Sequence, residues 1–321
     1  MKSPVNKKNN LLVALLGGTI GSGKNPEGIV TLSGDPAGAD LFDSIDKRFC
    51  YKVISPVRYS SENADAATYK QAISGILEEA KRPGTKYKGI LILHGTDSMA
   101  FFAQVAVRTL SQLKIPVMIT GSKRPADEDK SDALKNVTLA LGILHAAVKD
   151  GTGARTFGVV YEDSYTGKAV YMDAKDAETA DINGDMRSFV DRSGKEYIKF
   201  SKKGKSPFAS EEYMKKTESF IKREAGKILV IPAVPGAYIP GDPDGFKAVL
   251  IECYHSGTAD DKNLISLIRK AKEAGIPVLM GPAPEDGNIY TSRKVLEQEG
   301  AKVISGMPFE GIWAEAVIDN A

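Results

Sequence analysis

Short apolar runs alternate along the chain with segments in which apolar residues recur at helical spacing. Apolar runs that end in glycine or polar residues are typical of buried strands. In the first part of the chain we expect strands at residues 11–16, 51–57, 89–93, 115–122 and 156–163. Helical spacing is clearest at Leu134, Val137, Leu141, Leu144 and Val148. This alternation predicts an α/β fold with a mainly parallel sheet covered by helices.

The alternation breaks at a charged, lysine-rich segment between Lys199 and Lys227, and resumes on a smaller scale after it. The chain has 321 residues, whereas single hydrophobic cores stop growing at roughly 250 to 300 residues. We therefore expect a larger N-terminal α/β domain at residues 1–200, a linker at 201–226 and a smaller C-terminal α/β domain at 227–321.

Charge and cysteine content limit the function classes. The 43 lysine and arginine residues nearly balance the 41 aspartate and glutamate residues, so neither nucleic acid nor a membrane surface is expected as a partner. Cys50 and Cys253 lack ligand or redox spacing, which predicts free thiols in a reducing compartment. A basic segment precedes the first apolar run, as in a signal peptide, but the run is short and no Ala-x-Ala site follows. We predict a cytoplasmic protein.

Two of the predicted strands end in glycine followed by threonine, at Thr19 and at Thr96. In open parallel sheets, ligands bind beyond the carboxyl ends of the strands, so both hydroxyls are well placed for chemistry. A hydroxyl can act in acyl transfer when a base takes its proton and hydrogen-bond donors stabilise the oxyanion. The structural alternative is that Thr96 or Asp97 only caps the following helix, since both residue types are good N-caps.

The first of these turns also resembles a phosphate-binding loop. Residues 18–25 fit that pattern up to the last position, where Asn25 replaces the serine or threonine that holds magnesium. In that pattern Thr19 would stand at a position that can hold any residue. The pattern also expects an aspartate at the end of a second apolar strand, and Glu252, which ends such a strand here, is a poor substitute. This alternative predicts magnesium-dependent ATP hydrolysis. The three histidines match no metal-site spacing, and we expect no metal.

The turns and four further blocks together resemble the bacterial-type L-asparaginase family. The blocks GGTIGSG and LHGTDSM are similar to its two signatures. The four other blocks agree with the family's order: Tyr59–Asn63, then Gly121–Pro125, then Ser131 and Asp132 with Asn136, and finally residues 248–259. The resemblance covers residues 11 to about 316 and implies hydrolysis of L-asparagine to L-aspartate and ammonia without a metal or organic cofactor.

The resemblance also implies roles for individual residues. Thr19 would attack the side-chain amide and form an acyl-enzyme that water then cleaves. Thr96 would manage protons together with Asp97 and a lysine. The substrate would be held by residues around these turns, namely Gly18, Ser61, Glu62, Thr96 and Asp97. Thr258 stands where the family usually places an asparagine that completes the site of a neighbouring subunit, so a homodimer or homotetramer is implied.

The chain departs from the family pattern at two functional positions. Ile29 stands where the family has a tyrosine in the loop after the first strand. The catalytic lysine is also ambiguous, because neither Lys168 nor Lys175 fits the family spacing without a gap. We prefer Lys175, which needs the smaller gap to Asp185.

Two alternatives to an L-asparaginase stay open. One is the subunit that deamidates glutamine for transfer-RNA-dependent amidation, which usually has an extra N-terminal domain. The other is a family member that binds amino acids but has weak or lost turnover, which the missing tyrosine makes conceivable. Glu62 implies that glutamine is a second substrate, because family members with glutamate there often accept it.

Overall fold

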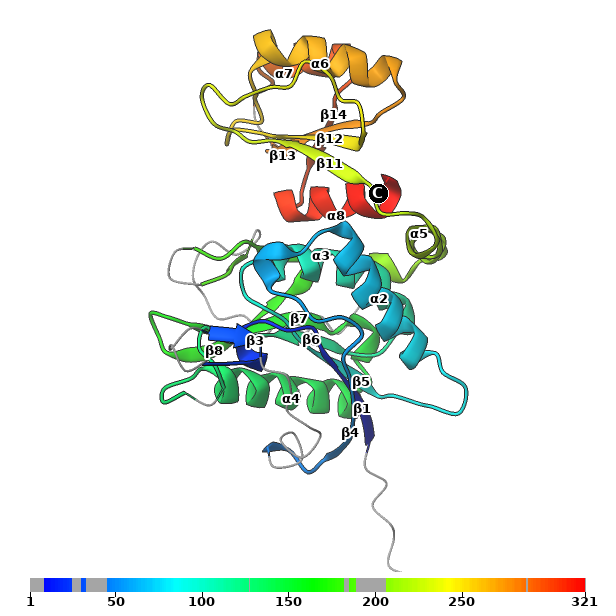
Figure 1. The fold of residues 1–321 in the computed structure, drawn as a ribbon, viewed down its shortest axis with the longest axis vertical. Helices are drawn as coiled ribbons and strands as arrows, with labels where there is room; N and C mark the ends of the chain where they lie inside the picture. Colours follow the sequence, from blue (N-terminus) through cyan, green and yellow to red (C-terminus); the bar gives the residue numbers. More distant parts are fainter. Residues whose placement is uncertain are drawn as a thin grey trace, which may run out of the picture. The chain divides into compact units, whose positions relative to one another are not determined.

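A computed structural model describes residues 9–24, 30–32, 45–126, 128–181, 185–188, 206–286 and 288–320. The chain divides into two compact units, Met1–Met214 and Lys215–Ala321. The division falls inside the charged segment expected as a linker at 201–226. Both units are α/β, as predicted, and Figure 1 shows the elements of each.

The first unit is built on a six-stranded sheet with the order β4-β1-β5-β6-β7-β8. Its strands are β1 (Asn9–Leu15), β4 (Phe49–Ile54), β5 (Gly89–Leu93), β6 (Val117–Thr120), β7 (Phe157–Asp163) and β8 (Lys168–Asp173). Neighbouring strands are parallel except β8, which is antiparallel to β7. The prediction of a mainly parallel sheet is confirmed. We call the two ends of this sheet the carboxyl end and the amino end, after the ends of its parallel strands.

Helices cover both faces of this sheet (Figure 1). Helices α2 (Ala66–Ala80) and α3 (Met99–Leu110) lie on one face, and α4 (Ala133–Asp150) lies on the other. Every residue of β5 is buried. Because both faces are covered, the central strands are continuous apolar runs without alternation.

The buried side of α4 differs from the expected one at its first turn. Leu134 is 62% exposed, whereas Val137, Leu141 and Leu144 are buried in the core with strand residues such as Leu91. The buried residues at the start of the helix are Ala133 and Asn136, and Asn136 is fully buried. Apolar spacing alone therefore misplaced the start of the buried stripe, because a hydrogen-bonded polar residue occupies it.

Shorter elements complete this unit. Two-stranded antiparallel sheets join β2 (Ser22–Lys24) to β3 (Val30–Leu32) and β9 (Ala177–Glu178) to β10 (Arg187–Ser188). Single turns of 3-10 helix are η1 (Thr19–Gly21), η2 (Ser61–Asn63), η3 (Ser111–Leu113), η4 (Gly153–Arg155), η5 (Ala174–Asp176) and η6 (Pro207–Ala209). Helix α5 (Glu211–Lys222) contains the division between the two units.

The second unit is a four-stranded parallel sheet with the order β11-β12-β13-β14. Its strands are β11 (Lys227–Ile231), β12 (Phe246–Glu252), β13 (Val278–Ala283) and β14 (Lys302–Ser305), and its helices are α6 (Asp261–Glu273), α7 (Thr291–Glu299) and α8 (Phe309–Asn320). One apolar cluster joins the sheet to α6 and α7, and a second joins it to α8. The sheet is therefore covered on both faces.

Among the described residues, no helix is both long and apolar enough to cross a bilayer. Within the same residues, no group of three histidine, cysteine, aspartate or glutamate side chains is arranged to hold a metal ion.

Candidate active site

The exits of β1, β4 and β5 meet at the carboxyl end of the larger sheet. The backbone N–H of Leu16 donates to Leu93 O at 3.0 Å, and that of Tyr59 donates to Leu16 O at 3.0 Å. An isolated parallel bridge also joins Gly17 to Tyr59. The pairing of the strands thus continues into the turns that follow them, which fixes three loops beside one another.

Two glycines allow the closest approach among these loops. Gly18 has φ +82°, and a Cβ placed on it would lie 2.2 Å from Gly95 Cα. A Cβ on Gly95 would lie 2.4 Å from Ser61 Oγ. No side chain fits at either position, and φ at Gly18 lies in the region that glycine adopts without strain. The close contact brings the residues that follow, Thr19 and Thr96, to the same end of the sheet.

Thr19 and Thr96 are both half-buried there. Thr19 begins the 3-10 turn η1. The methyl carbon of Thr96 lies 3.5 Å from the position that a Cβ on Gly121 would take, at the exit of β6. Thr96 is therefore enclosed by the exits of both β5 and β6.

The helix-cap explanation of Thr96 and Asp97 is wrong. The residue at the N-cap position of α3 is Ser98, and no side chain caps that helix. The hydroxyl of Thr96 and the carboxylate of Asp97 are therefore not used to start α3. This leaves both groups at the carboxyl end for another purpose.

Hydrogen bonds tie the loop after β4 to the turn after β5. Ser61, only 4% exposed, donates through Oγ to Asp97 Oδ2 at 3.3 Å. Ser98 Oγ donates to Ser61 O at 2.6 Å, and Tyr69 O–H donates to Ser98 O at 3.1 Å. Glu62 follows Ser61 and is exposed. The structure thus groups four of the predicted site positions, 18, 61, 62 and 97, around the two threonines.

A buried histidine forms hydrogen bonds with the turn after β5 and with the loop after β4. His94 is fully buried, and its Nδ1 lies 2.6 Å from Gly95 O while its Nε2 lies 2.7 Å from the Tyr59 hydroxyl. A carbonyl oxygen only accepts, so Nδ1 must carry the proton and Nε2 accepts from Tyr59. Burial lowers the pKa of His94 to about 4, although the hydrogen bond to Gly95 O acts in the opposite direction. The ring is neutral at physiological pH and stacks on Phe102 with centroids 4.7 Å apart.

The Gly121–Pro125 block forms the exit of β6 and is anchored to α4. Asp132 accepts from the backbone N–H of Lys123 at 2.9 Å, and Asn136 Nδ2 donates to Gly121 O at 3.0 Å. Asn136 also donates to Asp132 at 2.9 Å. These contacts explain the spacing of the motif in physical terms, because its polar residues hold the loop backbone beside Thr96.

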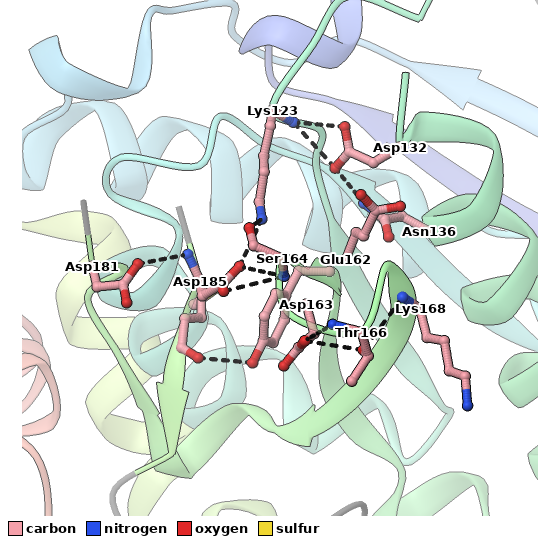
Figure 2. Close-up of polar contacts among 12 residues, drawn as sticks. Lys123, Asp132, Asn136, Glu162, Asp163, Ser164, Thr166, Lys168, Asp181 and Asp185 are labelled. Atoms are coloured by element: carbon pink, nitrogen blue, oxygen red, sulfur yellow. Dashed lines mark hydrogen bonds and ion pairs between the residues drawn. The ribbon is translucent and has the colours of Figure 1, made fainter. Parts of the chain in front are cut away.

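Lys123 extends from this loop into a polar cluster at the exit of β7 (Figure 2). Its Nζ lies 2.6 Å from Asp185 Oδ1 and 2.5 Å from Ser164 Oγ. The backbone N–H of Ser164 donates to both Asp185 oxygens at 3.0 and 3.1 Å. Burial acts to raise the pKa of Asp185, but the hydrogen bonds from Lys123 and Ser164 outweigh it and hold the pKa below its ordinary value. A charged pair thus lies at the carboxyl end.

The two lysines considered from the sequence lie elsewhere. Because β8 is antiparallel, its last residue, Asp173, pairs with Gly158 near the start of β7. Lys175 therefore lies at the amino end of the sheet, against our prediction that it serves Thr96, and its Nζ pairs with Asp176 at 2.6 Å. Lys168 begins β8 at the carboxyl end but is exposed, and in Figure 2 its side chain points away from Asp185.

The remaining predicted positions are placed as follows. Thr258 lies in the second unit, where its hydroxyl and that of Ser256 are 2.9 Å apart. Ile29, where the family has a tyrosine, lies outside the described residues.

Sequence reasoning missed Lys123 and the Tyr59–His94 pair. The signal for Lys123 was present, since Leu93 pairs in register with Thr120 and each strand is followed three residues later by Thr96 or Lys123. The Tyr59–His94 contact joins residues 35 positions apart and has no local signature.

Fold and site define an α/β protein with two threonines at the carboxyl end of its larger sheet. The family model described as "Asparaginase, N-terminal" matches residues 10–173, more than half of the chain. The chain belongs to the asparaginase family and has its amidohydrolase fold.

Curated relatives include two kinds of protein. The D subunit of glutamyl-tRNA(Gln) amidotransferase from Methanosarcina acetivorans is 25% identical over 267 residues, covering 74% of this chain and 55% of the relative. L-asparaginase 1 from Escherichia coli K12 is 31% identical over 140 residues, covering 42% of this chain and 40% of the relative. This chain therefore spans about half the length of the amidotransferase subunits that it matches.

Solved structures with the same fold include L-asparaginases. That from Thermococcus kodakarensis has a TM-score of 0.65 at 19% identity, covering 96% of this chain and 92% of that one. A probable cytoplasmic L-asparaginase from Campylobacter jejuni has a TM-score of 0.68 at 18% identity, covering 97% and 93%. At these identities the likeness shows the fold.

Proposed function

We propose that the protein hydrolyses L-asparagine to L-aspartate and ammonia at the carboxyl end of its larger sheet. The observation that carries this proposal is the contact between Gly18 and Gly95, because it brings two threonine-bearing turns together beside Ser61 and Asp97. Thr19 Oγ adds to the side-chain amide carbon, the C–N bond breaks, and nitrogen leaves as ammonia after gaining a proton. Water then cleaves the resulting ester and restores the Thr19 hydroxyl.

The groups around the threonines suit the two charged ends of an amino acid. The Asp97 and Glu62 carboxylates attract the substrate ammonium. The Ser61 hydroxyl, which now donates to Asp97 at 3.3 Å, can donate to the substrate carboxylate instead. Binding both ends of the amino acid fixes the side-chain amide relative to Thr19.

We propose Lys123 in place of Lys175 as the lysine of this site. Lys123 belongs to the strand exit that encloses Thr96, and Asp185 keeps its ammonium at the carboxyl end. A fixed positive charge at this end favours the negative charge that develops during acyl transfer. Replacing Lys123 with methionine should lower kcat by about tenfold or more. The matched change Lys149→Met, at an exposed position near the end of α4, should leave kcat unchanged.

The test of the proposed reaction is ammonia release from L-asparagine, L-glutamine and both D-isomers. We expect turnover with L-asparagine, and loss of it in Thr19→Ala with the fold retained by circular dichroism. Binding of L-asparagine without ammonia release would favour the alternative of a binding protein that has lost turnover. Full activity in Thr19→Ala would exclude this threonine as the nucleophile.

A second candidate function is favoured by the curated relatives. Five amidotransferase D subunits, from Methanosarcina, Aeropyrum and Pyrococcus species, match 68 to 74% of this chain. A glutaminase component would prefer glutamine, so the ratio of kcat/KM for L-asparagine to that for L-glutamine separates the candidates. A ratio above one supports the asparaginase, and a ratio far below one supports the amidotransferase component.

Assembly and location belong to the same proposal. We expect a homodimer or homotetramer in the cytoplasm, with Thr258 of one copy near the site of another. Light scattering of the purified chain would measure the assembly, and a monomer with full activity would exclude a role for Thr258 in a neighbouring site.

A further inference from the structure

A cavity of about 150 Å³ opens at the amino end of the larger sheet, away from the two threonines. All of its walls belong to the first unit. They come from the end of α3 and the following turn, the starts of β6 and β7, the end of β8, and the turns η4, η5 and η6. The lining residues that matter for a ligand are Val107, Phe157, Arg155, Asp173 and Lys175.

The buried part of the cavity wall combines apolar and hydroxyl-bearing side chains, and Ser111 and Thr156 are 5% and 2% exposed. Val107 and Phe157 are 3% and 7% exposed, whereas Arg155 and Asp173 are half-buried and Lys175 is exposed. A volume of about 150 Å³ is large enough for a group of the size of benzene. A branched aliphatic side chain of three or four carbon atoms therefore fits the inner part.

The charged side chains at the mouth have both signs. Arg155, Asp173 and Lys175 all line the cavity, and the ammonium of Lys175 is already paired with Asp176 at 2.6 Å. Arg155 forms no ion pair with any described residue, and the Asp173 side chain accepts from the backbone N–H of Lys175 at 3.2 Å. Burial raises the pKa of Asp173 to about 6, against the influence of Lys175. The mouth thus holds a guanidinium that no described carboxylate neutralises and a carboxylate that burial disfavours in its charged form.

We infer that this cavity binds a free α-amino acid with an aliphatic side chain of the size of valine or leucine. The ligand carboxylate pairs with Arg155, its ammonium pairs with Asp173, and its side chain lies against Val107 and Phe157. Charge-assisted hydrogen bonds from a guanidinium to a carboxylate are among the stronger polar contacts available in proteins. This inference does not depend on the reaction proposed for the carboxyl end.

The cavity wall is rigidly held, as a binding site requires. Gln104 of α3 donates through Nε2 to Lys175 O at 2.9 Å and to Ala177 O at 3.1 Å. Arg108 lies over the Phe208 ring at 4.9 Å from its centroid and donates to Gln104 Oε1 at 2.6 Å. These contacts fix η5 and η6, which form two sides of the cavity, to one helix.

The test is isothermal titration of the full chain with L-leucine and L-valine. We expect binding of one molecule per chain, weakened about tenfold or more in Asp173→Asn and in Arg155→Gln, because each removes one charged contact. Lys168→Gln, an exposed change outside the cavity, serves as the control and should bind normally. Glycine, which has no side chain, should bind at least tenfold more weakly than leucine.

Three outcomes would overturn the inference. The first is no heat of binding for either amino acid at 10 mM, about a hundred times a Kd of 0.1 mM. The second is binding that both cavity variants leave unchanged. The third is binding that is lost in Ser61→Ala but kept in Asp173→Asn, since leucine would then occupy the carboxyl end.

Discussion

The two ends of the larger sheet use the same strands but have different chemistry. At the carboxyl end, Gly18 and Gly95 let three loops pack backbone to backbone, and hydroxyls and carboxylates converge there. At the amino end, the strand ends and the turns beside them enclose a cavity that is lined by both apolar and polar side chains. Close packing of strand exits, rather than residue type alone, thus distinguishes the proposed reaction site from the proposed binding cavity.

Strand direction decides which end a residue joins. Lys123 and Lys175 both follow a strand of the sheet closely. Lys123 follows a parallel strand and lies at the carboxyl end, whereas Lys175 follows the antiparallel strand β8 and lies at the amino end. The reversed direction of β8 therefore places Lys175 at the opposite end of the sheet from Lys123.

The largest difference between the two ends is expected for threonine variants in an activity assay. Thr96→Ala should lower kcat about 10⁴-fold, by analogy with the removal of a nucleophile or its base. Thr152→Ala, in the turn before β7 at the amino end, should change kcat less than twofold. Steady-state ammonia release measures both variants, and equal losses would mean that the carboxyl end has no special role.

Alanine at two glycines with the same φ should separate packing from backbone strain. Gly18 and Gly84 both have φ +82°, but an added Cβ at Gly84 meets no atom within 4 Å. Gly18→Ala should cost about 3 to 4 kcal/mol of unfolding free energy, because strain and overpacking add. Gly84→Ala should cost about 1 kcal/mol from strain alone. Urea unfolding gives both values, and similar losses would contradict the close packing of residues 18 and 95.

His94 should make the protein acid-labile. Its pKa is lowered to about 4 by burial, so the unfolded chain binds more protons than the folded chain between pH 4 and about 6.5. Folding stability should therefore fall by about 2 to 3 kcal/mol as pH decreases across this window. His94→Asn, which keeps an N–H to donate to Gly95 O, should show a weaker fall in urea unfolding. An unchanged pH profile in this variant would assign the acid lability to other groups.

Asp173 at the amino end should make folding stability change with pH in the opposite direction to His94. Its effect should be the smallest of those predicted here. Its pKa is raised to about 6 by burial, so the folded chain binds more protons than the unfolded chain between about pH 4 and 6. Stability from this group is present below that window and decreases as pH rises through it. Asp173→Asn should therefore be more stable than the natural chain at pH 7 by about 1 to 2 kcal/mol, measured by urea unfolding. A less stable variant would contradict the burial of this carboxylate.

Much of the fold followed from the apolar pattern, because buried parallel strands and amphipathic helices have distinct periods. The rule that ligands bind beyond the carboxyl ends of strands placed the two threonines, whereas the grouping of Ser61 with Asp97 came from the resemblance to the asparaginase family. The location of Lys175 could not be predicted, because spacing along the chain does not report strand direction. Leu134 was misplaced because Asn136 is buried through hydrogen bonds that apolar periodicity does not detect.

The most direct test of the central claim is a crystal structure of the protein with L-aspartate bound. The account predicts aspartate at the carboxyl end, with Thr19 and Thr96 Oγ atoms on either side of its side-chain carboxylate and both within about 3.2 Å of it. Its ammonium should contact Asp97. Aspartate that contacts only one of the two threonines, or that binds only at the amino end, would contradict the claim.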